Sequence, residues 1–167
     1  MGMLDFVKSA GEKLFGTGKA KASMAEAAAE PANAAKIKAA NDAAADAITA
    51  YIGTQNLKAT GLLVTYDGAS ATATVYGVAP DQATREKIVL CCGNVSGVAA
   101  VNNMMSVDQS APEATYYTVV SGDNLSKISK AQYGDANKYM KIFEANKPML
   151  SHPDKIYPGQ VLRIPPL

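Results

Sequence analysis

The sequence has no tryptophan, only three phenylalanines and only two cysteines, and its charges almost cancel. Sixteen Lys and Arg against fifteen Asp and Glu leave a formal net charge of +1. A chain with so little net charge and so few aromatic side chains lacks the basic and stacking surfaces that are typical of nucleic-acid-binding proteins. It also has no continuous apolar run long enough to span a membrane. We therefore expect neither nucleic acid nor a membrane as a partner.

The two cysteines, Cys91 and Cys92, are adjacent in the sequence. This spacing suits neither a loop-closing disulfide nor a metal site with separated ligands, so we expect two reduced thiols packed in a core. The first twenty residues mix apolar side chains with charged ones and do not form the apolar core of a secretion signal. We therefore expect a cytoplasmic protein.

The first 36 residues divide into two segments. Large apolar side chains recur at helical spacing between Met3 and Phe15, and glycines follow them. Residues 1–16 are therefore predicted to form a short helix that packs on the first domain. Residues 17–36 are rich in alanine and contain Pro31, which indicates a linker with few side chains to bury.

Residues 37–109 have the pattern of a small α/β sandwich. Apolar periodicity predicts a helix, two strands, a second helix and a third strand, at residues 37–51, 57–66, 69–78, 80–93 and 98–107. The pair Asp67-Gly68 predicts a tight turn between the first two strands. This order places the helices on one side of a sheet whose other face is in solvent.

Residues 110–115 contain a proline and few large apolar side chains, which indicates a linker between domains. Residues 116–167 then predict a strand, two helices separated at Gly134, and a closing strand at 161–164. The halves differ in charge, because residues 37–110 carry four basic and six acidic groups whereas residues 116–167 carry seven and four. We expect this difference to attract the halves only weakly, since exposed ion pairs contribute little.

Two motifs in the second half, YTVVSGDNL at residues 117–125 and IYPGQVLRIP at residues 156–165, closely resemble the LysM domain family. In the first half, the hairpin strand VYGV at residues 75–78 and the helix end GNVSGV at residues 93–98 are similar to the BON domain family. With residues 6–15, FVKSAGEKLF, this combination resembles the bacterial cytoplasmic potassium-binding protein family.

The resemblance covers nearly the whole chain except residues 17–36, where this sequence has a longer alanine-rich insert. It implies an α+β fold of two small domains, an α-β-β-α-β BON sandwich at 37–109 followed by a β-α-α-β LysM module at 116–167. It also implies that the protein binds K⁺ and becomes more ordered on binding, as a sensor or a buffer of the ion.

K⁺ is a large, singly charged ion, so neutral backbone carbonyls suit it better than a cage of carboxylates. Helix ends leave carbonyls without intrahelical partners, and glycine-containing turns can fold them inward. The candidate ligands are the backbone carbonyls of Val7, Ala10, Gly93, Val95, Gly97 and Val98. The residues alone favour ordinary helix ends, since glycines are common there, whereas the family resemblance favours the ion. We expect Rb⁺ and Cs⁺ to compete with K⁺ better than Na⁺ or divalent ions do.

The LysM resemblance also implies a shallow groove for N-acetylglucosamine, formed by two loops. Its candidate residues are Gly122, Asp123, Asn124, Leu125, Lys147, Pro148, Met149 and Leu150. The alternative function is therefore a peptidoglycan-binding protein of the cell envelope. We favour a role of these residues in capping and packing the module, because a cytoplasmic protein would not meet cell-wall glycan. A third possibility is an adaptor that binds another protein.

Catalysis has little support in the sequence. His152 is the only histidine, and no nucleophile and base stand at a recognised catalytic spacing. We expect a monomer that is not an enzyme.

Overall fold

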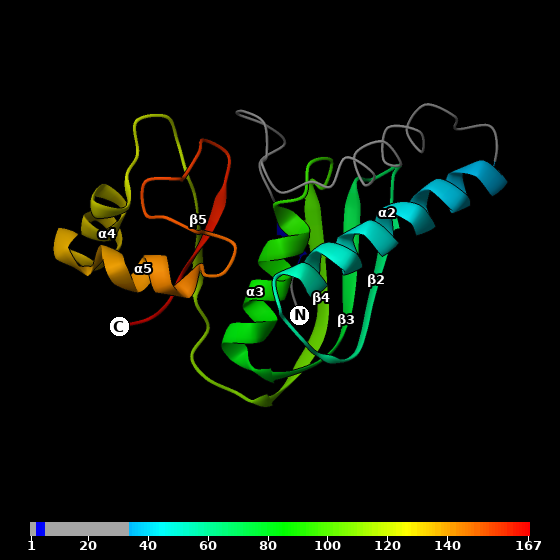
Figure 1. Cartoon of the computed structure of the whole chain (residues 1–167), viewed down its shortest axis with the longest axis horizontal. Helices are drawn as coiled ribbons and strands as arrows, with labels where there is room; N and C mark the ends of the chain where they lie inside the picture. The colour runs from blue at the N-terminus through cyan, green and yellow to red at the C-terminus, as the bar shows by residue number, and fades with distance from the viewer. Residues whose placement is uncertain (1–2, 6–33) are drawn as a thin grey trace.

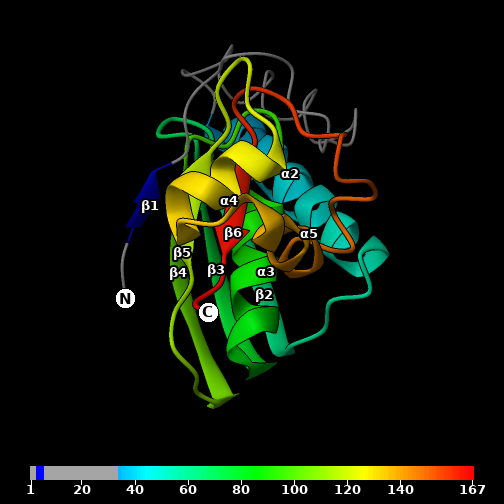
Figure 2. The same cartoon turned by 90° about the vertical axis from the view of Figure 1, so that its left-hand side faces the viewer.

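The computed structural model describes residues 3–5 and 34–167, which form two small modules side by side (Figures 1 and 2). The first module contains β1 (Met3–Asp5), α2 (Ala34–Thr54), β2 (Thr60–Asp67), β3 (Thr72–Asp81), α3 (Gln82–Gly93) and β4 (Ala100–Gln109). The second contains β5 (Thr115–Thr118), α4 (Leu125–Tyr133), the short 3₁₀ helix η1 (Ala136–Lys138), α5 (Tyr139–Ala145) and β6 (Val161–Ile164). The predicted α+β class with two small domains is confirmed.

The first module is a four-stranded sheet with two helices on one face (Figure 1). The strand order is β1-β4-β3-β2; β3 and β4 are parallel, and the other neighbours are antiparallel. Helix α3 connects the parallel pair, because parallel neighbours need a crossover connection. The helices α2 and α3 cover the same side of the sheet, as the sequence predicted, and share one core.

Side chains alternate along the strands of this sheet. On β3, Ala73, Val75 and Ala79 are completely buried beneath the helices, whereas Tyr76 is exposed on the opposite face. The helices contribute large apolar side chains to the same core: Ile48 and Ile52 from α2, and Ile88, Val89 and Leu90 from α3. The sheet thus has one buried face and one face in solvent.

The structure corrects the prediction of a helix at the N-terminus. The strand β1 pairs antiparallel with β4, so that Met3 lies opposite Asn102 and Asp5 opposite Ala100. An edge strand has backbone N–H and C=O groups that need partners, and three extended residues supply them to β4. The rest of that predicted helix and most of the alanine-rich linker lie outside the described residues, and α2 already includes residues 34–36.

The connection between β2 and β3 is also wider than predicted. Asp67 pairs with Thr72, so the loop has four residues instead of a two-residue turn. The Asp67 carboxylate accepts hydrogen bonds from the Ala69 N–H at 3.1 Å and the Ser70 hydroxyl at 2.6 Å. A side chain that bonds to the loop ahead of it in this way favours a longer turn.

The second module has a smaller sheet, the antiparallel pair β5–β6. Asn124 caps the start of α4 by accepting a hydrogen bond from the Lys127 N–H at 2.8 Å, and Gly134 ends the helix in the left-handed conformation. Eight buried side chains form its core: Val119, Leu125, Ile128, Ile142, Phe143, Leu150, Leu162 and Ile164. Among the described residues of both modules, no helix is long and apolar enough to cross a membrane.

Candidate functional site

The turn between α3 and β4, residues 93–98, is the part of the candidate site that the structure describes. Asn94 caps the C-terminus of α3, and its backbone N–H donates to the Leu90 carbonyl at 3.0 Å. Val95 and Val98 are buried, and Gly97 has a φ of +98°, a conformation that favours glycine. The helix therefore ends at this turn, as the glycine spacing predicted.

Two of the candidate carbonyls in this turn accept hydrogen bonds. The Val95 carbonyl accepts from the Val98 N–H at 3.1 Å, and the Gly97 carbonyl accepts from the Tyr66 hydroxyl at 3.0 Å. A carbonyl oxygen has two lone pairs, so each can take part in a second interaction. A cation at these oxygens must share them with their present donors or displace the donors.

The two candidate ligands near the N-terminus, Val7 and Ala10, lie outside the described residues, whereas the strand that precedes them in sequence, β1, is described. Because Asp5 pairs with Ala100, the chain leaves β1 at the end of β4 that follows the turn (Figure 2). The register of β1 therefore places Asp5 beside the start of β4, which follows the turn.

The chemistry of the turn fits a monovalent cation. Backbone carbonyls are neutral, and in the described part of the chain no group of three or more His, Cys, Asp or Glu side chains is placed to hold a metal. A divalent ion would find no cage of carboxylates there to replace its hydration shell. The donor set suits a large, weakly hydrated ion such as K⁺.

The thiols of Cys91 and Cys92, at the end of α3, are free and buried, as expected for core residues. Burial raises the pKa of the Cys92 thiol to about 12 and also raises the pKa of the Cys91 thiol. Both thiols therefore stay protonated near neutral pH, whereas the thiolate is the form that binds metal ions.

The candidate turn is attached to the second module by the side chain of Asn94. Its Nδ2 donates to the Val161 carbonyl of β6 at 3.0 Å, and its Oδ1 accepts from the Val161 N–H at 3.1 Å. Asn94 is buried, with 3% of its surface exposed. Sequence reasoning missed this contact, which joins residues 67 positions apart.

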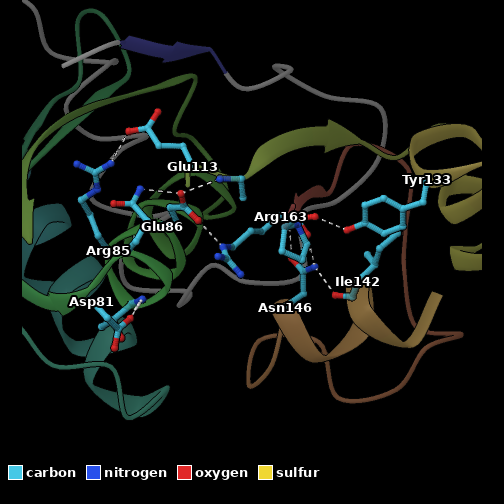
Figure 3. Close-up of polar contacts among 12 residues, drawn as sticks. Asp81, Arg85, Glu86, Glu113, Tyr133, Ile142, Asn146 and Arg163 are labelled. Carbon is cyan, nitrogen blue, oxygen red and sulfur yellow. Dashed lines mark hydrogen bonds and ion pairs between the residues drawn. The ribbon is translucent and has the colours of Figure 1, made fainter. Parts of the chain in front are cut away.

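A buried ion pair joins the same two elements, α3 and β6 (Figure 3). Glu86 pairs with Arg163, and its other carboxylate oxygen accepts from the Gln82 side chain at 2.8 Å and the Ala114 N–H at 3.0 Å. The weak attraction expected from net charge is therefore not the main link between the modules. One sequence signal could have indicated a buried ion pair, because Arg163 is the charged residue in an otherwise apolar strand.

A hollow on the second module overlaps the predicted glycan groove only in part. A hollow of about 490 Å³ lies on the second module, lined by Asn124, Leu125, Ser126, Tyr139, His152, Pro153 and Asp154. Only two of the eight candidate residues line it. On the second predicted loop, Pro148 is exposed and Lys147 partly so, whereas Met149 and Leu150 are buried, and Met149 packs in the core of the first module.

The residues on the first predicted loop have structural roles in the described contacts. The Asp123 carboxylate accepts from the Tyr117 hydroxyl at 2.8 Å and from the Val120 N–H at 2.9 Å. The Gly122 carbonyl accepts from the Lys127 ammonium at 3.0 Å. These contacts close the loop and support the packing role expected from the sequence.

Comparison with known proteins identifies both modules. The BON domain family matches residues 40–109, and the LysM domain family matches residues 117–165. A protein of Escherichia coli O6:H1, "Potassium binding protein Kbp", is 46% identical over 168 residues, which cover 99% of each chain. An "Uncharacterized protein" of Deinococcus radiodurans is 55% identical over 51 residues, 30% of this chain and 19% of its own length.

Proposed function

The chain belongs to the family of the potassium binding protein Kbp, and on that premise we propose that it binds K⁺ in the cytoplasm and does not catalyse a reaction. The observation that carries the proposal is the similarity to Kbp, which extends through both modules and nearly the full length of each chain. The neutral donor set of the turn after α3 supports it. The two free, buried thiols are compatible with a reducing compartment.

We place the ion between the turn after α3 and the segment that follows β1. The proposed ligands are the backbone carbonyls of Val7, Ala10, Gly93, Val95, Gly97 and Val98. The pairing of Asp5 with Ala100 supports this arrangement, because it places the end of β1 beside the start of β4, which follows the turn. The carbonyls would then come from two parts of the chain that lie almost ninety residues apart in sequence.

Such a site makes the protein more ordered when K⁺ binds. Carbonyl oxygens that converge from two segments repel one another without a cation and must find water instead. An ion that binds only the closed arrangement stabilises it by an amount that grows with ion concentration, about 2.7 kcal/mol at a hundredfold excess over Kd. A protein whose order follows K⁺ concentration is suited to act as a sensor of the ion.

Calorimetric titration of the full chain in a buffer free of K⁺ tests the proposal. KCl should give saturable heat, and RbCl and CsCl should compete with KCl better than NaCl, MgCl₂ or CaCl₂ do. A chito-oligosaccharide serves as the comparison ligand for the second module. Saturable heat with the oligosaccharide alone would contradict the proposal, and tight Ca²⁺ binding at millimolar K⁺ would contradict a site of neutral carbonyls.

A further inference from the structure

Two buried asparagines close the same edge of β6, and they come from different modules. Asn94 of the BON module bonds to both backbone polar groups of Val161, as described above. Asn146 of the LysM module does the same two residues later, because its Nδ2 donates to the Arg163 carbonyl and its Oδ1 accepts from the Arg163 N–H, both at 2.8 Å (Figure 3). Its Nδ2 also donates to the Ile142 carbonyl at 2.7 Å.

This edge of β6 needs such partners. In an antiparallel pair, the backbone groups of alternate residues point toward the neighbouring strand and away from it. Within the described residues, strand β6 has one neighbouring strand, β5, so the outward groups of Val161 and Arg163 have no strand there to pair with. A side-chain amide has a donor and an acceptor at the spacing of a peptide group, and each asparagine therefore replaces one residue of a missing strand.

The two asparagines differ in the segment of chain to which each belongs. Asn146 follows α5 and belongs to the same module as β6. Asn94 lies inside the turn of candidate K⁺ ligands, between Gly93 and Val95. The Gly93 carbonyl belongs to the planar peptide unit that includes the Asn94 nitrogen, so fixing Asn94 limits the rotation of that carbonyl.

We propose that Asn94 is a positioning residue of the K⁺ site, through which β6 of the LysM module holds the ligand turn in its binding geometry. The inference rests on the proposed function. Asn94 is buried, where hydrogen bonds are stronger than in water and no bulk water replaces a lost partner. Its backbone N–H is fixed to Leu90 and its side chain to Val161, so both sides of the residue are held. The binding geometry of the BON turn therefore depends on a strand of the other module.

The test compares Asn94→Ala with the matched variant Asn146→Ala in the full chain. Both remove an asparagine amide from the edge of β6, but only N94A releases the turn. Partners that orient metal ligands typically change affinity by about 10- to 100-fold when mutated. We expect the K⁺ affinity of N94A to fall about tenfold or more, and that of N146A to stay within about twofold of the wild type.

Selectivity gives a readout that a purely structural role would not change. A loosened turn can contract around the smaller Na⁺, so the ratio of K⁺ to Na⁺ affinity should fall in N94A and not in N146A. Circular dichroism at the titration temperature establishes that each variant is folded. If N94A does not fold, Asn94→Leu replaces it, because leucine is close to asparagine in shape but has no hydrogen-bonding atoms.

Three results would overturn the inference. Wild-type K⁺ affinity in a folded Asn94 variant would show that the amide does not position the turn. Equal losses in N94A and N146A would show that any loosening of β6 has the same effect. A wild-type chain that binds no K⁺ would overturn the proposed function and this inference with it, whereas the first two results would leave the proposed function intact.

Discussion

The two modules complete their sheets by different means. The BON module has a four-stranded sheet covered by α2 and α3, and most of its core comes from its own residues. The LysM module has two strands of four residues each, and its outer edge is closed by the side chains of Asn94 and Asn146. A two-stranded sheet is marginally stable alone, so the smaller module depends on what packs beside it.

What packs beside it is α3. Eight of the twelve residues of this helix are buried, because one side of it faces the BON sheet and another faces the LysM module. Met149 and Val161 of the LysM module join the BON core there, and the partly buried Tyr116 packs against it. The modules therefore share a helix, and we expect damage at α3 to affect both.

The largest effect should follow from breaking the buried ion pair. Glu86→Gln leaves the charge of Arg163 buried without its partner, and removing one member of such a pair costs about 3–5 kcal/mol. We expect urea unfolding to show this loss in one transition that includes both modules. Asp42→Asn is the control, since the exposed pair of Lys38 and Asp42 should contribute almost nothing. A change limited to the LysM module in E86Q would contradict the shared helix.

A smaller effect should follow from glycine substitutions matched between the modules. Gly77 in β3 has a φ of +137°, and a Cβ there would lie 3.1 Å from the Thr60 carbonyl oxygen and 3.2 Å from the Leu62 Cα. Gly134 has a φ of +74° with nothing within 4 Å. We expect G134A to cost about 1–2 kcal/mol from backbone strain and G77A to cost more, because strain and overlap add. Chemical denaturation of both variants measures the difference, and a smaller cost for G77A would contradict the close strand contact.

Alkaline pH should destabilise the core of the BON module, which contains Cys92. The pKa of the Cys92 thiol is raised by burial from 9.0 to about 12, so the folded state keeps a proton that the unfolded state loses above pH 9. Stability is therefore complete below about pH 9 and declines as pH rises toward 12, by about 1 kcal/mol per pH unit for this thiol. Urea midpoints between pH 8 and pH 10.5 should fall less steeply for Cys92→Ala. Equal slopes would contradict the burial of this thiol.

The smallest effect concerns Tyr66, whose hydroxyl donates to the Gly97 carbonyl. Tyr66→Phe removes one hydrogen bond and should cost about 1 kcal/mol in buffer without K⁺. If K⁺ displaces this donor when it binds the carbonyl, the cost should shrink in saturating KCl. Thermal unfolding with and without KCl measures both values, and a cost that does not depend on K⁺ would contradict displacement of the Tyr66 donor by the ion.

The sequence predicted the parts of the fold that depend on local pattern. The alternation of apolar and polar residues on β3 predicted which face of the sheet is buried, and Gly134 predicted the end of α4. The strand β1 was missed because three residues have no strand pattern of their own and are extended only by pairing with β4. The width of the loop after Asp67 was missed because a side chain sets it.

The candidate site was predictable in the same limited way. Gly93 and Gly97 indicated a turn that could present carbonyls, and the structure has that turn. The contacts of Asn94 with Val161 and of Glu86 with Arg163 join residues 67 and 77 positions apart, and no local pattern encodes them. The net charges of the halves indicated attraction but not a buried pair.

The most direct test of the account is residue-resolved amide hydrogen exchange of the full chain with and without K⁺. We predict added protection across residues 88–101 and at the Val161 amide, which donates to Asn94. The Arg163 amide, which donates to Asn146, should change little, as should the helices α4 and α5. Equal added protection at all these positions, or no change across residues 88–101, would contradict the account.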